Sequence, residues 1–118
     1  MHIRIVDDDD ISRLLYSKVF QKDECYIFEK GTEFCNEYIA CDVVIINLNM
    51  PIMNGYDVLN FLYINNYNPI IYVISTKECL NHKLLYEKKL IYNYIRKPIP
   101  DISSLRDKVL SSVKNIKT

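Results

Sequence analysis

Residues 42–55 read DVVIINLNMPIMNG, and this segment carries the clearest structural signal in the chain. A run of β-branched residues from Val43 to Ile46 leads to the polar Asn47. A continuous apolar run is typical of a strand that is buried on both faces of a parallel sheet. The Met-Pro pair and Gly55 then indicate a turn before the next element. The segment therefore predicts a central strand of an α/β protein.

Similar runs recur along the 118-residue chain and alternate with helical patterns. Strands are predicted at five short segments rich in Val, Ile and Tyr: 2–6, 25–28, 43–48, 70–75 and 92–96. Helices are predicted at about 11–21, 32–39, 55–65, 78–89 and 101–116. The first and last helices each carry an apolar face: Ile11, Leu14, Leu15, Val19 and Phe20 in one, and Ile102, Leu105, Val109, Val113 and Ile116 in the other. We expect these faces to pack on the sheet.

The alternation of strands and helices predicts one flavodoxin-like (βα)5 domain that covers residues 1–118. In this α/β fold a doubly wound parallel sheet of five strands has the order 2-1-3-4-5, with helices on both faces. Ligands of such sheets bind beyond the carboxyl ends of the strands, next to strand 1. The functional residues are therefore expected at that edge.

Polar side chains follow four of the predicted strands. Asp7 and Asp8 come after the first strand, Asn47 ends the third, Ser75 ends the fourth and Lys97 follows the fifth. Paired carboxylates beside another oxygen ligand are the kind of site that Mg²⁺ prefers. A lysine supplies a point charge for a phosphoryl oxygen, and a hydroxyl supplies a hydrogen bond. The following Asp9 and Asp10 suit the N-terminus of a helix.

Together these motifs resemble the receiver domains of response regulators, and the resemblance covers essentially the whole chain. It is carried by the acidic pair after the first strand, by the turn with Met50, Pro51, Met53 and Gly55, and by Lys97-Pro98. The resemblance implies metal-binding carboxylates at Asp7 and Asp8, with the backbone carbonyl of Asn49 as a further ligand. It also implies that Pro98 follows a peptide bond prone to the cis form.

The resemblance further implies residues that contact the phosphoryl group and transmit its presence. Lys97 corresponds to the phosphate-contacting lysine, and Tyr94, three residues earlier, corresponds to the aromatic switch residue. The switch hydroxyl is assigned to Ser75, although counting forward from Pro69 points instead to Ile74. Tyr94 is also consistent with an aromatic residue of the core.

Asn47 stands where the family carries its phosphate-accepting aspartate. An amide has no full negative charge and is a far weaker nucleophile than a carboxylate, so phosphotransfer at this position is expected to be absent. Loss of one carboxylate also weakens the expected Mg²⁺ site. We therefore expect a non-catalytic, phosphorylation-independent pseudo-receiver of two-component signalling. The alternatives are a conventional phosphorelay receiver with an engineered Asp-to-Asn block at position 47, a shifted phosphorylation site and a different family.

Two other families share parts of this pattern. Haloacid-dehalogenase-type phosphohydrolases also place an Asp-x-Asp pair after the first strand, which would be Asp7 with Asp9 or Asp8 with Asp10 here. Membership in that family would not explain the Met50-Pro51 turn. Flavodoxin-type flavin carriers bind phosphate in their first loop, where four aspartates would repel it.

The amino-acid composition limits the classes of binding partner that this protein can have. Fifteen basic and fifteen acidic residues balance to a net charge of zero, which argues against nucleic-acid or anionic-membrane binding. The four cysteines lack metal-site spacing and are interpreted as reduced thiols of a cytoplasmic protein. The expected partners are signalling proteins, a histidine kinase or an effector. A homodimer through the face of helix 78–89, strand 92–96 and helix 101–116 is a further expectation.

Overall fold

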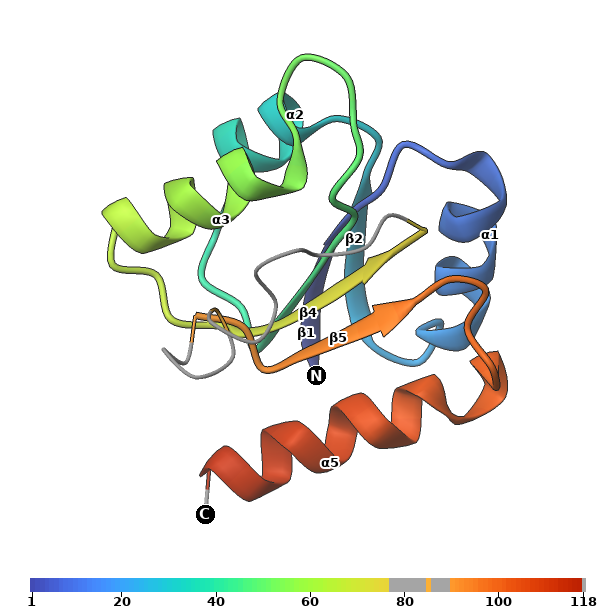
Figure 1. Cartoon of the computed structure of the whole chain (residues 1–118). Coiled ribbons are helices and arrows are strands. Elements are labelled where there is room, and N and C mark those ends of the chain that lie inside the picture. The colour runs from blue at the N-terminus through green and yellow to red at the C-terminus, as the bar shows by residue number, and fades with distance from the viewer. Residues whose placement is uncertain (77–84, 86–89, 118) are drawn as a thin grey trace.

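The structure, a computed structural model, describes residues 1–76, 85 and 90–117 (Figure 1). Five parallel strands form one sheet in the order β2-β1-β3-β4-β5. The strands are β1 (His2–Val6), β2 (Glu24–Phe28), β3 (Val43–Ile46), β4 (Ile70–Ser75) and β5 (Asn93–Arg96). The parallel sheet and its strand order are thus confirmed.

Helices cover both faces of this sheet, as Figure 1 shows. They are α1 (Asp10–Val19), α2 (Gly31–Asn36), α3 (Gly55–Ile64) and α5 (Leu105–Lys117), with a 3-10 turn, η1 (Ile102–Ser104), before α5. The helix expected at 78–89 lies outside the described residues, apart from Leu85. Helix α2 ends earlier than expected, at Asn36. None of the helices in the described part of the chain is long and apolar enough to cross a membrane.

Two hydrophobic cores lie on opposite faces of the sheet because successive strand side chains point to opposite sides. In β1, Ile3 and Ile5 face α1 and α5, whereas Val6 faces α2 and α3. The first core contains Tyr16 and Phe20 from the α1 segment and Leu105, Val109 and Val113 from α5. The second contains Phe34 of α2 and Val58 and Leu62 of α3. All four described helices are therefore anchored by apolar contacts with the sheet.

The apolar face predicted for the first helix is largely not the buried one. Ile11 and Leu14 are 69% and 56% exposed, and Leu15 is exposed as well. Of the predicted residues, Phe20 is buried and Val19 packs against the core, and Tyr16, which was not predicted, is buried beside them. The hydrogen bond from the Ser12 N–H to the Asp9 carboxylate, at 2.9 Å, caps the helix in this orientation. In α5, Ile116 of the predicted stripe is also exposed.

Gly55 allows the β3–α3 loop to fold back over the end of β3. A Cβ atom at this position would lie 2.5 Å from the Asn47 carbonyl oxygen and 2.7 Å from the Leu48 Cα. The Gly55 N–H donates to the Leu48 carbonyl at 2.9 Å, and the side chains of Asn54 and Asp57 form a capping box that starts α3. This close approach places the loop beside Asn47.

Candidate functional site

The carboxyl ends of β1, β3 and β5 bring together four of the predicted site residues. The ammonium Nζ of Lys97 lies 2.7 Å from Asp7 Oδ2, across 90 positions in the sequence. The amide nitrogen Nδ2 of Asn47 lies 3.0 Å from Asp8 Oδ1, across 39 positions. The parallel sheet produces both contacts, because β1 lies next to β3 and all strands end at the same edge.

Asp7 is a buried carboxylate whose two oxygens both have partners. Its side chain is 1% exposed, and that of Lys97 is 12% exposed. Oδ2 accepts from Lys97, and Oδ1 accepts from the Asp9 N–H at 2.9 Å. Burial raises the pKa of Asp7 above its usual range, although the hydrogen bond from Lys97 opposes this effect. Asp7 and Lys97 therefore form a buried ion pair at the centre of the site.

Asn47 is buried, and its amide nitrogen donates to two acceptors. These are Asp8 Oδ1 at 3.0 Å and the Asn49 carbonyl oxygen at 3.2 Å. A rotated amide would turn its own oxygen toward two atoms that can only accept, so the network requires the nitrogen on this side. The N–H of Asn47 also donates to the Val6 carbonyl, which ties the end of β3 to β1. The side chain is thus held in one orientation.

The oxygens in this arrangement do not fit a Mg²⁺ site. Mg²⁺ requires near-octahedral oxygen ligands, usually including one or two carboxylates. Both oxygens of Asp7 are engaged, and Asp8 Oδ1 and the Asn49 carbonyl face the amide hydrogens of Asn47. Within residues 1–76, 85 and 90–117, no group of three His, Cys, Asp or Glu side chains is placed to hold a metal ion.

Ser75 and Tyr94 lie on the two strands at one side of the sheet, β4 and β5. Ser75 is fully buried at the end of β4, and its carbonyl accepts from the Lys97 N–H at 2.9 Å. Ile74, the other candidate for the switch position, packs in the core on the α1 and α5 side. Tyr94 is half-buried against the core on the α2 and α3 side. The Lys97-Pro98 peptide bond is cis.

A groove beside the acidic site was not predicted, because Ile11 and Leu15, which line it, were expected in the core. It has a volume of about 380 Å³ and lies between α1 and the segment from Lys97 to Ile102. Its apolar walls are Ile11, Leu15, Pro98, Ile99 and Ile102. The buried hydroxyl of Tyr16, a residue that also lines the groove, has no hydrogen-bond partner among the described residues.

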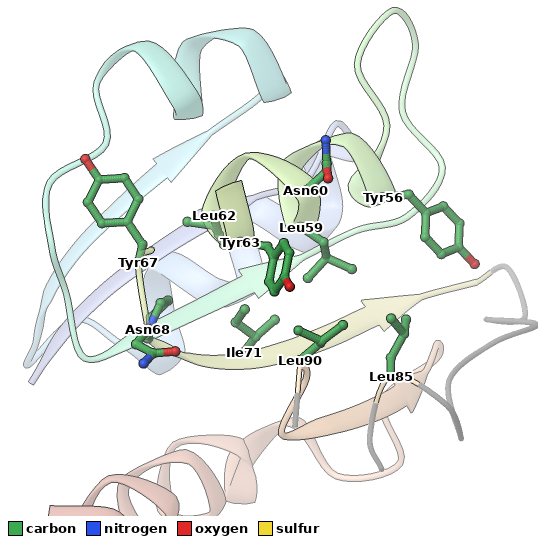
Figure 2. A pocket seen from close by; sticks show the side chains of 11 residues that line it. Tyr56, Leu59, Asn60, Leu62, Tyr63, Tyr67, Asn68, Ile71, Leu85 and Leu90 are labelled. Carbon is green, nitrogen blue, oxygen red and sulfur yellow. The ribbon is translucent and has the colours of Figure 1, made fainter. Parts of the chain in front are cut away.

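A second pocket, of about 250 Å³, lies between α3 and β4 (Figure 2). Leu59, Tyr63, Ile71 and Leu90 surround it, and the Tyr67 and Asn68 side chains are at one end. None of the residues at the strand ends that form the acidic site lines this pocket. It is therefore separate from the chemistry predicted for that site.

Comparison with known proteins identifies the family. The family model for the response regulator receiver domain matches residues 3–110. No curated protein sequence matches the chain. Among solved structures, a signal receiver domain from Vibrio parahaemolyticus superposes with a TM-score of 0.85 at 20% identity, covering 98% of this chain and 92% of that one.

Two further solved structures have the same fold. A CheY-like response regulator receiver domain protein from Methanospirillum hungatei has a TM-score of 0.78 and 20% identity, over 98% of this chain and 96% of that one. The chemotaxis protein CheY4 of Vibrio cholerae has a TM-score of 0.78 and 23% identity, over 95% and 97% of the two chains. With the family match across most of its length, this chain belongs to the response regulator receiver domain family.

Proposed function

We propose that this chain is a phosphorylation-independent receiver domain, which acts in two-component signalling through protein–protein contacts and without enzymatic activity. The observation that carries the proposal is the side chain at position 47. Receiver domains accept a phosphoryl group on an aspartate, and we infer that the buried Asn47 takes the corresponding position in this chain. The cytoplasm is the expected compartment.

The chemistry of the site supports this proposal. The nitrogen lone pair of an amide is delocalised and its oxygen carries no full charge, so Asn47 lacks the reactivity of a carboxylate nucleophile. Its nitrogen is also committed to Asp8 and to the Asn49 carbonyl. Lys97, which would stabilise a phosphoryl oxygen, is instead neutralised by Asp7 at 2.7 Å. The nucleophile is missing, and the cation already has a partner.

The exposed apolar face of α1 supports a role in protein contacts. Ile11, Leu14 and Leu15 are exposed there, and two of them line the groove beside Lys97. Exposed apolar patches of this kind mark interaction sites in soluble proteins. We propose that a signalling protein, a histidine kinase or an effector, packs on this face. A homodimer through β5, α5 and residues 78–89 remains a separate proposal.

The first test is the intact mass of the protein after incubation with Mg²⁺ and acetyl phosphate, a small-molecule phosphodonor. We expect the unaltered chain to gain no phosphoryl group. The Asn47→Asp variant tests the rest of the site, and Asn68→Asp, an exposed position between α3 and β4, provides the matched control. A phosphoryl gain on the unaltered protein would contradict the proposal and indicate another acceptor.

The variant also tests the conventional alternative. A phosphoryl gain on Asn47→Asp alone means that the remaining residues still support phosphotransfer, which favours a phosphorelay receiver blocked only at position 47. No gain on either form favours a domain that works by contact alone. Hydrolysis of a generic phosphate ester, lost in Asp7→Asn, would instead support a phosphohydrolase; we expect none.

A further inference from the structure

We propose that the side-chain amide of Asn47 takes the place of a metal ion in this pocket, so that the site is complete without Mg²⁺. The inference deepens the proposed function, and it rests on the same residue. It concerns the resting structure of the pocket, whereas the proposed function concerns phosphotransfer. The two are therefore tested by different measurements.

The amide nitrogen connects three segments that an ion would otherwise connect. Asn47 lies at the end of β3, Asp8 lies between β1 and α1, and Asn49 lies in the loop that leads to α3. The two hydrogens of the amide point at the Asp8 carboxylate and the Asn49 carbonyl, at nitrogen–oxygen distances of 3.0 and 3.2 Å. Both acceptors occupy positions to which the family resemblance assigns metal ligands. A single side chain thus donates hydrogen bonds to two of the oxygens that were expected to bind the metal.

Electrostatics explains why an amide can do this and an aspartate cannot. Oxygen acceptors that converge on one point repel each other unless a positive group lies between them. The amide hydrogens carry partial positive charge, so the Asn47 side chain contributes the missing positive group itself. An aspartate at position 47 would add a third carboxylate next to Asp7 and Asp8, and no donor would remain between the oxygens.

Asp7 also has its own positive partner. Lys97 donates to its Oδ2, and the Asp9 N–H donates to its Oδ1. Each of the two carboxylates that follow β1 is therefore bound to a donor from the protein. Mg²⁺ that bound Asp8 Oδ1 and the Asn49 carbonyl would have to displace both hydrogen bonds of the Asn47 amide. The loss of these hydrogen bonds disfavours binding of a metal ion.

The test compares unfolding in urea with 10 mM MgCl₂ and with EDTA, at constant ionic strength, for the unaltered protein, Asn47→Asp and the control Asn68→Asp. Anything that binds the native state alone stabilises it by mass action. For Asn47→Asp we expect Mg²⁺ to raise the folding equilibrium constant roughly tenfold, the value for metal at about ten times its dissociation constant. For the other two proteins we expect less than about a twofold change. Folding of Asn47→Asp only in Mg²⁺ would support the inference as well.

A second measurement does not depend on the stability of any variant. Mn²⁺ replaces Mg²⁺ in oxygen sites and broadens the NMR signals of nearby nuclei. In the unaltered protein we expect no selective broadening of the backbone amides of Asp8 and Asn49 or of the Asn47 side-chain amide. Selective broadening there, or a clear stabilisation by Mg²⁺, would overturn the inference. Metal binding without phosphoryl gain would refute this inference and leave the proposed function intact, whereas phosphoryl gain would refute the function.

Discussion

The ion pair between Lys97 and Asp7 offers a quantitative test of how the site is held together. The perturbation is Lys97→Met, which keeps the length of the side chain and removes its charge. Because the Asp7 side chain is 1% exposed and its partner nitrogen lies 2.7 Å away, the variant leaves a buried carboxylate with no positive partner. Removal of one member of a buried pair costs about 3–5 kcal/mol. Lys97 is itself partly exposed, so we expect a loss of about 3 kcal/mol.

The double variant Asp7→Asn with Lys97→Met distinguishes the interaction energy of the pair from the separate contributions of the two side chains. It removes both charges, so no buried carboxylate remains unpaired, and we expect a loss of about 1 kcal/mol or less. Asp7→Asn alone leaves a lysine that can reach water, and we expect an intermediate loss. The coupling energy between the two positions is then at least about 3 kcal/mol, well above the roughly 0.5 kcal/mol of independent sites.

The stability loss caused by Lys97→Met is also expected to change with pH in a definite direction. Burial raises the pKa of Asp7 in the native state above its unfolded value, so the native state binds this proton more readily than the unfolded chain does. The ionised carboxylate therefore lowers stability above its native pKa, and this penalty disappears as the pH falls toward the usual aspartate range near about 4. Without Lys97 the native pKa rises further. The loss caused by Lys97→Met should thus shrink on acidification.

The assay is urea unfolding followed by far-UV circular dichroism at pH 7 and pH 5, with free energies from linear extrapolation. Additive effects of the two substitutions would refute the reasoning, because they would mean that Asp7 and Lys97 do not interact energetically. A Lys97→Met loss that stays constant or grows as the pH falls would refute the sign of the pKa argument. Equal slopes against urea in all variants would show that the native fold is retained.

Two further predictions concern the loops next to the site. Asp9→Ala removes the N-cap of α1 and should cost about 1 kcal/mol at pH 7 by urea unfolding. Hydrogen bonds from Ser12 lower the pKa of Asp9, so the stabilisation is present above the unfolded pKa, near about 4, and the difference from the unaltered protein should vanish as the pH falls through the lower native value. Ile52 is almost fully exposed with a φ of 66°, in a turn where the Met53 N–H donates to the Pro51 carbonyl. Left-handed backbone is strained for a β-branched residue, so Ile52→Asn should stabilise the protein by about 0.5–1 kcal/mol in thermal unfolding; destabilisation would contradict the strain argument.

The order of the strands and the candidate site residues were predictable from local patterns. Continuous apolar runs specify buried parallel strands, and the right-handed crossover rule leaves few topologies for five of them. Residues that end those strands must then gather at one edge, which is why Asp7, Asp8, Asn47 and Lys97 were expected together. The contacts of Asp7 with Lys97 and of Asp8 with Asn47 agree with that expectation.

The buried face of α1 was not predictable in the same way. The predicted face joined Ile11, Leu14 and Leu15 with Phe20, whereas the buried residues are Tyr16 and Phe20. At about 3.6 residues per turn the first three residues lie nearly opposite Tyr16 and Phe20 on the helix, and helical periodicity alone does not decide which side is buried. The choice depends on the volume available against β1 and on the cap at Asp9, and both are properties of the assembled fold.

Local sequence was sufficient to specify the α/β architecture and to place Asn47 directly after the third strand. These features depend on the order of apolar and polar residues along the chain. The tertiary structure was needed to show that the Asn47 amide faces Asp8 and the Asn49 carbonyl, that Asp7 is neutralised by Lys97, and that α1 exposes an apolar face. Hydrogen-bond direction, ion pairing and burial depend on which distant segments meet. Only the folded chain brings together groups that lie 39 and 90 residues apart.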